Sequence, residues 1–249
     1  MNFRIRFLVI LFIAALQSCS GPYYLKNSQA SQTHIKQDSL KLVDTVVLKM
    51  IAPYKMKLDS QMNEVISVSD VDLLKERPEG TLCNLFADAI LAYGNKVHDK
   101  PVDICILNYG GIRVSSIAKG NITLGKAYEI MPFDNMLEVI EIPGDQLKQL
   151  LTVVAQNGGW PVSGMRMKIA DSKAEDIFIG GQPINGSKNY LLITSDYIAN
   201  GGDNVTILQH LKRTALNYKI RDALIDYLRD HKANNKNINL VKDGRIIAN

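Results

Sequence analysis

A six-residue stretch, Asn108-Tyr-Gly-Gly-Ile-Arg113, combines residue types that suit the binding of an anion or a nucleotide. Its two glycines allow the backbone to approach a ligand closely. The arginine guanidinium presents a fork of hydrogen-bond donors that matches a phosphate, and the asparagine amide adds a donor and an acceptor. The hexamer therefore indicates a candidate binding site, although it also fits an ordinary turn with an exposed arginine.

The residues before this hexamer predict the element that positions it. Val102–Leu107 is an almost continuous apolar run, which is typical of a buried strand that ends in a tight turn. Further strands are expected at 65–71, 136–142, 164–169, 176–179 and 190–195, and a closing hairpin at 238–247 that turns at Asp243-Gly244. Strands interleave with helices, so the fold class is mixed α and β.

Apolar residues at helical spacing predict five helices. They are expected from about Asp38 to Tyr54, from Thr81 as N-cap to Gly94 as the stop, over 123–130, over 144–156, and from about Leu216 to His231. Pro53 is expected to bend or end the first of them. No internal repeat is present.

The first residues have the pattern of a bacterial lipoprotein signal. Arg4 and Arg6 precede an apolar run that ends in Leu16-Gln17-Ser18-Cys19, which resembles a lipobox with Cys19 as the lipidated residue. We therefore expect a signal peptide at 1–18, a flexible polar tether at 19–37 and one folded domain at 38–249. This organisation predicts a protein held in the bacterial cell envelope by a lipid anchor, on its periplasmic or outer-membrane face.

Composition narrows the partner classes further. The formal net charge of +4 falls to +2 once Arg4 and Arg6 leave with the signal, and so small an excess predicts no nucleic-acid partner. Cys83 and Cys105 remain in the mature chain, either as buried inert thiols or as a disulfide.

Several separated motifs then occur in a family order. They are Asn84-Leu85-x-x-Asp88-Ala89, Asn108-Tyr-Gly-Gly-Ile-Arg113, Pro132-Phe133-x-Asn135, Gly144-x-x-Leu147 and Tyr197-Ile-Ala-Asn-Gly-Gly-Asp203. This succession resembles the C-terminal domain of the 5'-nucleotidases, a family that also includes UDP-sugar and cyclic-phosphodiester hydrolases. The resemblance covers the chain from about Asp38 to its end. It implies a layered α/β sandwich that binds the nucleoside part of a substrate.

The resemblance also assigns roles to residues that would contact the base. Phe133 and Tyr197 match the two aromatic positions that clamp it, and Tyr197 stands where the family often has Phe. Asn108 matches the amide that touches the base or the ribose. Stacking on an aromatic ring accepts every base, so base preference does not follow from these positions.

Other matched positions face the sugar and the phosphate. Arg113 matches the arginine on the phosphate side, and Arg77 is the candidate for a second one. Asp203 matches the carboxylate that accepts hydrogen bonds from the ribose hydroxyls. Gly201 and Gly202 would let the loop backbone close on the sugar.

The chain shows no pattern of metal ligands. Its four histidines, His34, His98, His210 and His231, have no neighbouring ligands at metal spacing, and no serine or cysteine stands in a nucleophile motif. Full-length members of the family carry a separate metallophosphoesterase domain with two metal ions. We therefore expect no catalytic residue, metal or cofactor in this chain, and divalent metals only in a partner. Asp88 is expected to have a structural role.

Three functions fit these observations. The chain can be the substrate-recognition half of a split 5'-nucleotidase in nucleotide catabolism, completed by a separately encoded metallophosphoesterase. It can instead be a non-catalytic nucleoside-binding protein of the envelope, or a structural lipoprotein on a nucleotidase fold.

Overall fold

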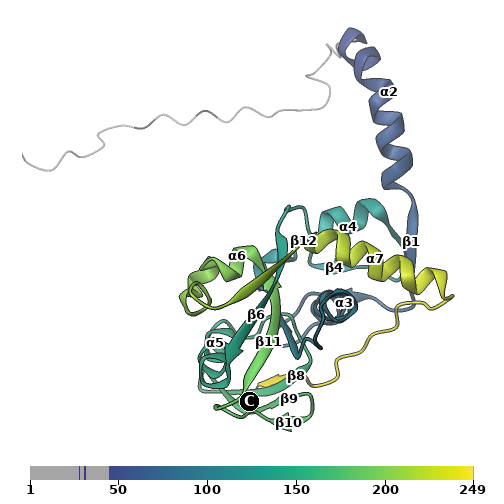
Figure 1. Ribbon diagram of the computed structural model, residues 1–249. Helices are drawn as coiled ribbons and strands as arrows, with labels where there is room; N and C mark the ends of the chain where they lie inside the picture. Colours follow the sequence, from purple (N-terminus) through teal and green to yellow (C-terminus); the bar gives the residue numbers. More distant parts are fainter. Residues whose placement is uncertain (1–27, 29–30, 32–44, 249) are drawn as a thin grey trace, which may run out of the picture. The chain divides into compact units, whose positions relative to one another are not determined.

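The computed structural model describes Ser28, Ser31 and residues 45–248 (Figure 1). Two units divide the chain, Met1–Met50 and Ile51–Asn249. The predicted signal peptide, Cys19, the tether and the start of the first predicted helix lie outside the described residues. No described helix has both the length and the apolar character needed to cross a membrane.

The described helices alternate with strands along the chain. The helices are α2 (Thr45–Met62), α3 (Thr81–Val97), α4 (Leu124–Ile130), α5 (Gly144–Gln156), α6 (Asp196–Ala199) and α7 (Ile220–Ala233), with 3-10 turns η2 (Tyr109–Gly111), η3 (Gly202–Asn204) and η4 (Thr206–Leu208). The strands are β1 (Val65–Ser69), β2 (Leu73–Leu74), β3 (Ile104–Ile106), β4 (Ser116–Ile117), β5 (Gly120–Thr123), β6 (Met136–Pro143), β7 (Val162–Ser163), β8 (Met165–Ala170), β9 (Lys173–Ile179), β10 (Gln182–Pro183), β11 (Asn189–Ser195), β12 (Arg213–Lys219) and β13 (Ile246–Ala248).

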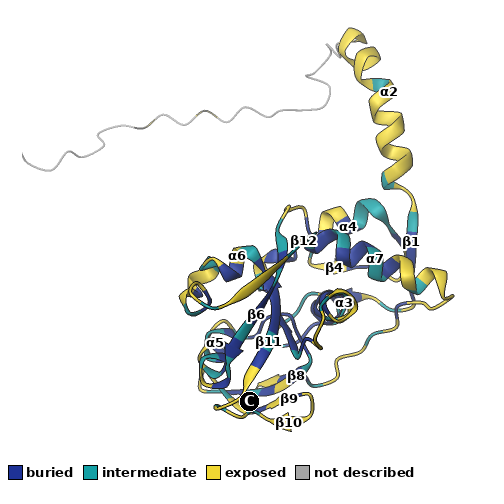
Figure 2. Cartoon of the chain, in the orientation of Figure 1, coloured by how far each residue is buried: buried dark blue, intermediate teal, exposed yellow. Residues whose placement is uncertain are grey.

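A five-stranded sheet in the order β12-β6-β11-β3-β7 forms the centre of the larger unit. Successive side chains of a strand point to opposite faces. In β3, Ile104 and Ile106 accordingly belong to one hydrophobic core, and Cys105 belongs to the other. Figure 2 shows β11 largely buried and β6 divided between buried and intermediate residues, as expected for strands that are covered on both faces.

Different elements cover the two faces of this sheet. Buried residues of α3 and α7, such as Ile90 and Leu224, pack in the core that also takes Cys105. On the other face, Leu150 of α5 and Met167 of β8 share a core with Ile104. A four-stranded sheet, β10-β9-β8-β13, supplies β8 to that layer. The predicted layered α/β sandwich is confirmed (Figure 1).

Helix α2 differs from the rest because none of its residues is buried in the described part of the chain. Pro53 lies inside this helix and does not end it, and the helix continues to Met62. Tyr54 and Met50 are 79% and 67% exposed. Figure 2 shows α2 exposed along almost its whole length.

The predicted ends of α3 were wrong in detail. Gly80, rather than Thr81, is the N-cap residue, because the Thr81 hydroxyl accepts a hydrogen bond from the backbone N–H of Leu74 instead. Gly94 does not stop the helix, which runs on to Val97. A Cβ at Gly94 would lie 2.8 Å from Cδ1 of Ile193, so this glycine permits close packing of helix on sheet.

Two predictions near the C-terminus were also wrong. Helix α7 begins at Ile220, because Leu216 belongs to β12, which pairs with β6. The expected closing hairpin is absent from the described residues: β13 pairs in parallel with β8, and Ile238 forms a bridge with Ser69. The Asp243-Gly244 turn therefore joins two segments that pair with different partners.

Candidate functional site

The strand directions bring three distant segments to one edge of the central sheet. β3 and β11 are parallel, so the residues that follow them, Asn108 and Tyr197, lie at the same edge. β6 runs antiparallel to β11, and its first residues therefore start from that edge, with Leu137 paired to Ser195. Asn135 directly precedes β6. The sheet thus gathers side chains from loops that are far apart in the sequence.

A cavity of about 370 Å³ lies at this edge. It is lined by Asn108, Gly110, Gly111, Arg113, Phe133, Asn135, Tyr197 and Asp203. Five of the eight residues predicted for binding are among them, from three separate motifs. Gly110 and Gly111 are the two glycines expected to let the backbone approach a ligand, whereas Asn135 had no role assigned from the sequence although it stands inside a motif that carried the resemblance.

The other three predicted residues are not among those that line the cavity. Gly201 and Gly202 precede Asp203 in its loop, and Gly202 begins η3. Arg77 is not among the residues that line the cavity. Its guanidinium carbon lies 4.1 Å from the ring centroid of Tyr109, so its charge rests on an aromatic face next to the hexamer.

The two aromatic residues of the cavity are exposed to an unusual degree. Phe133 is 42% exposed and Tyr197 is 45% exposed. Large rings in a concave wall bury apolar area when a flat ligand enters, so such exposure is typical of a binding surface. The guanidinium carbon of Arg113 lies 5.6 Å from the centroid of the Phe133 ring, which places a cation beside one aromatic wall.

Arg113 keeps most of its hydrogen-bonding capacity for a ligand. One guanidinium nitrogen donates to the carbonyl of Gly110 at 3.3 Å, and no ion pair to Arg113 is found within residues 45–248. Its backbone N–H donates to the carbonyl of Ile130 at 2.8 Å, which ties the hexamer to the end of α4. An exposed, anchored guanidinium of this kind suits a phosphate.

Gly111 packs closely against the Asn108 side chain. A Cβ at Gly111 would lie 3.0 Å from Oδ1 of Asn108, so a larger residue would make the amide shift. The 3-10 turn Tyr109–Gly111 then directs the chain past the cavity. Backbone and amide groups therefore meet the cavity together, as the sequence indicated.

The loop after β11 is held by a contact between its own residues. The Tyr197 hydroxyl donates a hydrogen bond to Oδ1 of Asp203 at 3.0 Å and accepts one from the Asp203 backbone N–H at 3.3 Å. Asp203 has a φ of 50°, in the left-handed region. A Cβ at Gly202 would lie 2.5 Å from the Tyr197 ring, so Gly202 makes room for that ring.

Lys75 adds positive charge that sequence reasoning missed. Its ammonium group donates to the carbonyl of Ile112 at 2.7 Å and lies 4.1 Å from the Tyr109 ring centroid. Burial lowers the pKa of Lys75, and the charges of Arg113 and Arg77 lower it further, while Cys83 acts in the opposite direction. The hexamer therefore sits in a locally positive environment.

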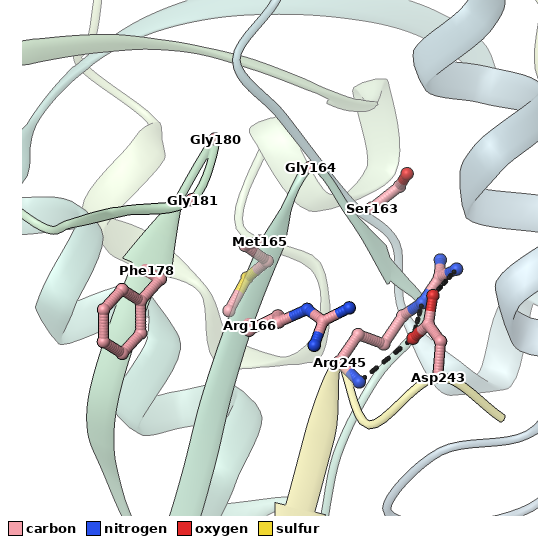
Figure 3. Close-up of a pocket in the computed structure, with 9 residues that line it drawn as sticks. All are labelled: Ser163, Gly164, Met165, Arg166, Phe178, Gly180, Gly181, Asp243 and Arg245. Carbon is pink, nitrogen blue, oxygen red and sulfur yellow. Dashed lines mark hydrogen bonds and ion pairs between the residues drawn. The ribbon is translucent and has the colours of Figure 1, made fainter.

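A second cavity, of about 340 Å³, is lined by Arg166, Asp243 and Arg245, and Arg245 is already ion-paired (Figure 3). Arg245 forms ion pairs with Asp88 at 2.7 Å and with Asp243 at 2.9 Å, and the Ser163 hydroxyl donates to Asp88 at 2.5 Å. Asp88 thus has a structural partner, in line with the role expected from its place on α3. Arg245 is engaged by two carboxylates, and Phe178 is the one aromatic residue among the lining residues, so this cavity is a weaker candidate for a nucleotide site than the first.

The residues of the first cavity do not fit a metal site. Asp203 is the one carboxylate among its described lining residues, and histidine is absent from that set. Within residues 45–248, no group of three or more His, Cys, Asp or Glu side chains is arranged to hold a metal ion. Cys83 and Cys105 are buried and free, and burial raises the pKa of Cys83 to about 11.

Comparisons with known proteins agree with this geometry. The model of the family described as "5'-nucleotidase, C-terminal domain" matches residues 62–210. A 5'-nucleotidase of Vibrio parahaemolyticus is 27% identical over 207 residues, which cover 81% of this chain and 36% of the relative. A cell wall protein of Listeria monocytogenes is 26% identical over 77% of this chain and 28% of its own length.

A solved structure shows the same architecture. The 5'-nucleotidase precursor of Thermus thermophilus superposes with a TM-score of 0.68 and 28% sequence identity, over 82% of this chain and 43% of the other. The chain therefore spans less than half the length of these relatives.

Proposed function

Because this chain belongs to the family of the 5'-nucleotidase C-terminal domain, we propose that it recognises nucleotides for a split 5'-nucleotidase. The observation that carries the proposal is one cavity that joins two half-exposed aromatic rings, Phe133 and Tyr197, to a cation and a carboxylate. Each of these groups suits a different part of a nucleoside monophosphate.

The base would stack on Phe133 and Tyr197. Stacking of a base on an aromatic side chain contributes roughly 1–3 kcal/mol and tolerates any base. Asp203 would accept hydrogen bonds from the ribose hydroxyls, and Arg113 would hold the phosphate. Asn108 and Asn135 supply amides that can bond to the base edge or the sugar.

The phosphoesterase half would be supplied by a second polypeptide. The donor set of this cavity does not fit a metal, whereas a two-metal centre in such a partner would activate water and polarise the phosphate ester. The residues of this chain would bind and orient the nucleotide, with Arg113 turned toward the scissile phosphate.

We place the protein in the bacterial cell envelope, attached by a lipid at Cys19. The lipobox supports the anchor, and the Listeria relative named as a cell wall protein supports the compartment. Metabolic labelling with a radioactive or alkyne fatty acid tests this: wild type should incorporate the label, and Cys19→Ser should not. Incorporation by Cys19→Ser would contradict the assignment.

Calorimetry with adenosine and AMP tests recognition. Phe133→Ala should weaken the binding of both ligands by roughly 5- to 150-fold, because one stacking contact is lost. Phe178→Ala is the matched control, since Phe178 is 39% exposed and lines the second cavity. Equal affinity in wild type and Phe133→Ala would contradict the proposal.

Activity with a partner tests the split enzyme. A candidate metallophosphoesterase from the same genome, loaded with Mn²⁺, should release phosphate from AMP faster when this chain is added. If AMP binds but the chain never raises the rate, the protein is instead a nucleoside-binding protein of the envelope.

A further inference from the structure

The first turn of α7 lies against the segment that carries Phe133, although no sequence motif connects them. Arg221 stands in this turn, is only 6% exposed and belongs to the part of the chain beyond the family match at 62–210. A buried arginine requires partners for its charge and for its five N–H groups. The partners of Arg221 therefore indicate its role in the structure.

Arg221 donates to backbone carbonyls in the segment that carries Phe133. One terminal nitrogen, Nη1, donates to the carbonyls of Met131 at 3.3 Å and of Phe133 at 3.2 Å. The other, Nη2, donates to Oδ1 of Asp134 at 2.7 Å. The planar guanidinium therefore bonds to residues 131, 133 and 134 at the same time.

Neighbouring contacts complete this attachment. The guanidinium of Arg221 lies 4.2 Å from the ring centroid of Tyr128 on α4, and Lys219 forms an ion pair with Asp134 at 3.1 Å. The backbone N–H of Ile220 donates to the carbonyl of Asn135 at 3.0 Å. Each residue from Phe133 to Asn135 is thus bonded to the start of α7.

The burial of Arg221 is hard to explain by stability alone. Its Nε is buried and has no hydrogen-bond partner among the described residues, so one donor has lost its water without replacement. Two of its acceptors are loop carbonyls, and its carboxylate partner Asp134 is 68% exposed at the side chain. A buried charge of this kind is often no more stabilising than an apolar residue of the same size.

We propose that Arg221 is a positioning residue that holds Phe133 in the position in which its ring can stack on the base. This inference rests on the proposed nucleotide recognition. If the backbone around the Phe133 ring is already fixed before the ligand arrives, less conformational entropy is lost on binding. Arg221 itself does not line the cavity, so it acts through Phe133.

A double-mutant cycle on AMP affinity tests this. Arg221→Gln should weaken AMP binding at least about threefold, and by no more than Phe133→Ala does, since a displaced ring loses its stacking contact. The double variant Arg221→Gln/Phe133→Ala should lose no more than Phe133→Ala alone. Losses that add in the double variant, or wild-type affinity in Arg221→Gln, would overturn the inference.

Arg229→Gln is the matched control. Arg229 lies on the same helix, is half-exposed and pairs with Glu64 at 2.8 Å, so its replacement removes the same charge without touching the 131–135 segment. It should bind AMP like wild type. Arg221→Lys should restore only part of the affinity, because an ammonium group cannot present the same planar fork.

A ligand-free readout separates failure of this inference from failure of the proposed function. Trp160 is the single tryptophan and is 4% exposed, so it serves as a buried reference for iodide quenching. A Phe133→Trp reporter should be quenched more strongly when Arg221→Gln is added, while Trp160 stays protected. If no variant binds a nucleotide, the proposed function fails and this quenching comparison alone decides the role of Arg221.

Asp134→Asn covers the case in which Arg221→Gln does not fold. Its exposed side chain can change without disturbing a core, yet the substitution weakens the shortest contact of Arg221. It should weaken AMP binding in the same non-additive way with Phe133→Ala. An additive loss would again overturn the inference.

Discussion

The phenol oxygen of Tyr197 lies 3.0 Å from Oδ1 of Asp203 and donates a hydrogen bond to it. The same oxygen accepts the backbone N–H of Asp203. These two bonds join the residue that would stack on the base to the residue that would bind the ribose. Oδ1 is occupied in the structure, so Oδ2 of Asp203 is the better placed acceptor for a sugar hydroxyl.

Tyr197→Phe should therefore affect sugar recognition more than stacking. The ring is kept, but the Asp203 carboxylate loses the bond that orients it, and its left-handed backbone loses a partner. We expect the affinity for adenosine to fall more than the affinity for 2',3'-dideoxyadenosine, as measured by calorimetry. Tyr54→Phe on α2 is the control; an equal effect on both ligands would contradict the assignment of Asp203.

Arg113→Ala should separate phosphate recognition from nucleoside recognition. AMP binding should weaken by about 1.5–3 kcal/mol, the contribution typical of hydrogen bonds to charged groups, whereas adenosine binding should hardly change. Parallel titrations of the two ligands measure this. Arg77→Ala, which removes the cation on the Tyr109 ring, should have a smaller effect on AMP because Arg77 does not line the cavity.

Asp88→Asn should destabilise the fold without changing nucleotide affinity. Arg245 is buried and would lose the charge of the carboxylate that binds two of its nitrogens, but it keeps its ion pair with Asp243, so we expect a loss of about 1.5–3 kcal/mol, typical of hydrogen bonds to charged groups. Urea unfolding measures the change. Asp230→Asn, which removes an exposed pair with Lys96, should cost less than about 1 kcal/mol.

The raised pKa of the Cys83 thiol should make the folded protein less stable at alkaline pH. Burial raises this pKa from an ordinary value of 9.0 to about 11, so the unfolded chain releases this proton at a lower pH than the folded chain. The stabilisation is therefore complete below pH 9 and is lost as the pH rises toward 11. Cys83→Ala should show a shallower fall of the melting temperature between pH 9 and 11 than wild type. Parallel curves would contradict the assignment.

The sequence predicted the helices and strands with strong periodicity and missed features that depend on tertiary contacts. The predicted helices at 123–130 and 144–156 agree with α4 and α5, except that Thr123 is the N-cap of α4 rather than its first residue. Gly94 was taken for a helix stop because its contact with Ile193 is invisible in a local pattern. Leu216 was placed in a helix because its pairing strand, β6, lies far away in the sequence.

The candidate site shows the same division. Ordered motifs pointed to residues that the strand directions then bring to one cavity, including Asn108 and Tyr197. Arg221 could not be found in this way, since its role comes from packing of α7 against a loop about ninety residues earlier. Lys75 was missed for a similar reason, because its contact with Ile112 joins two segments that share no motif.

The separation between Phe133 and its anchor also sets an order of events during synthesis. The carbonyl of Phe133 accepts its hydrogen bond from Arg221, which is synthesised 88 residues later. At ~5–20 residues translated per second, that interval lasts roughly 4–18 s. A nascent chain that already contains residues 108–113, Phe133 and Tyr197 would still lack α7, the helix that holds the Phe133 segment. The recognition surface therefore matures only after most of the polypeptide has been made.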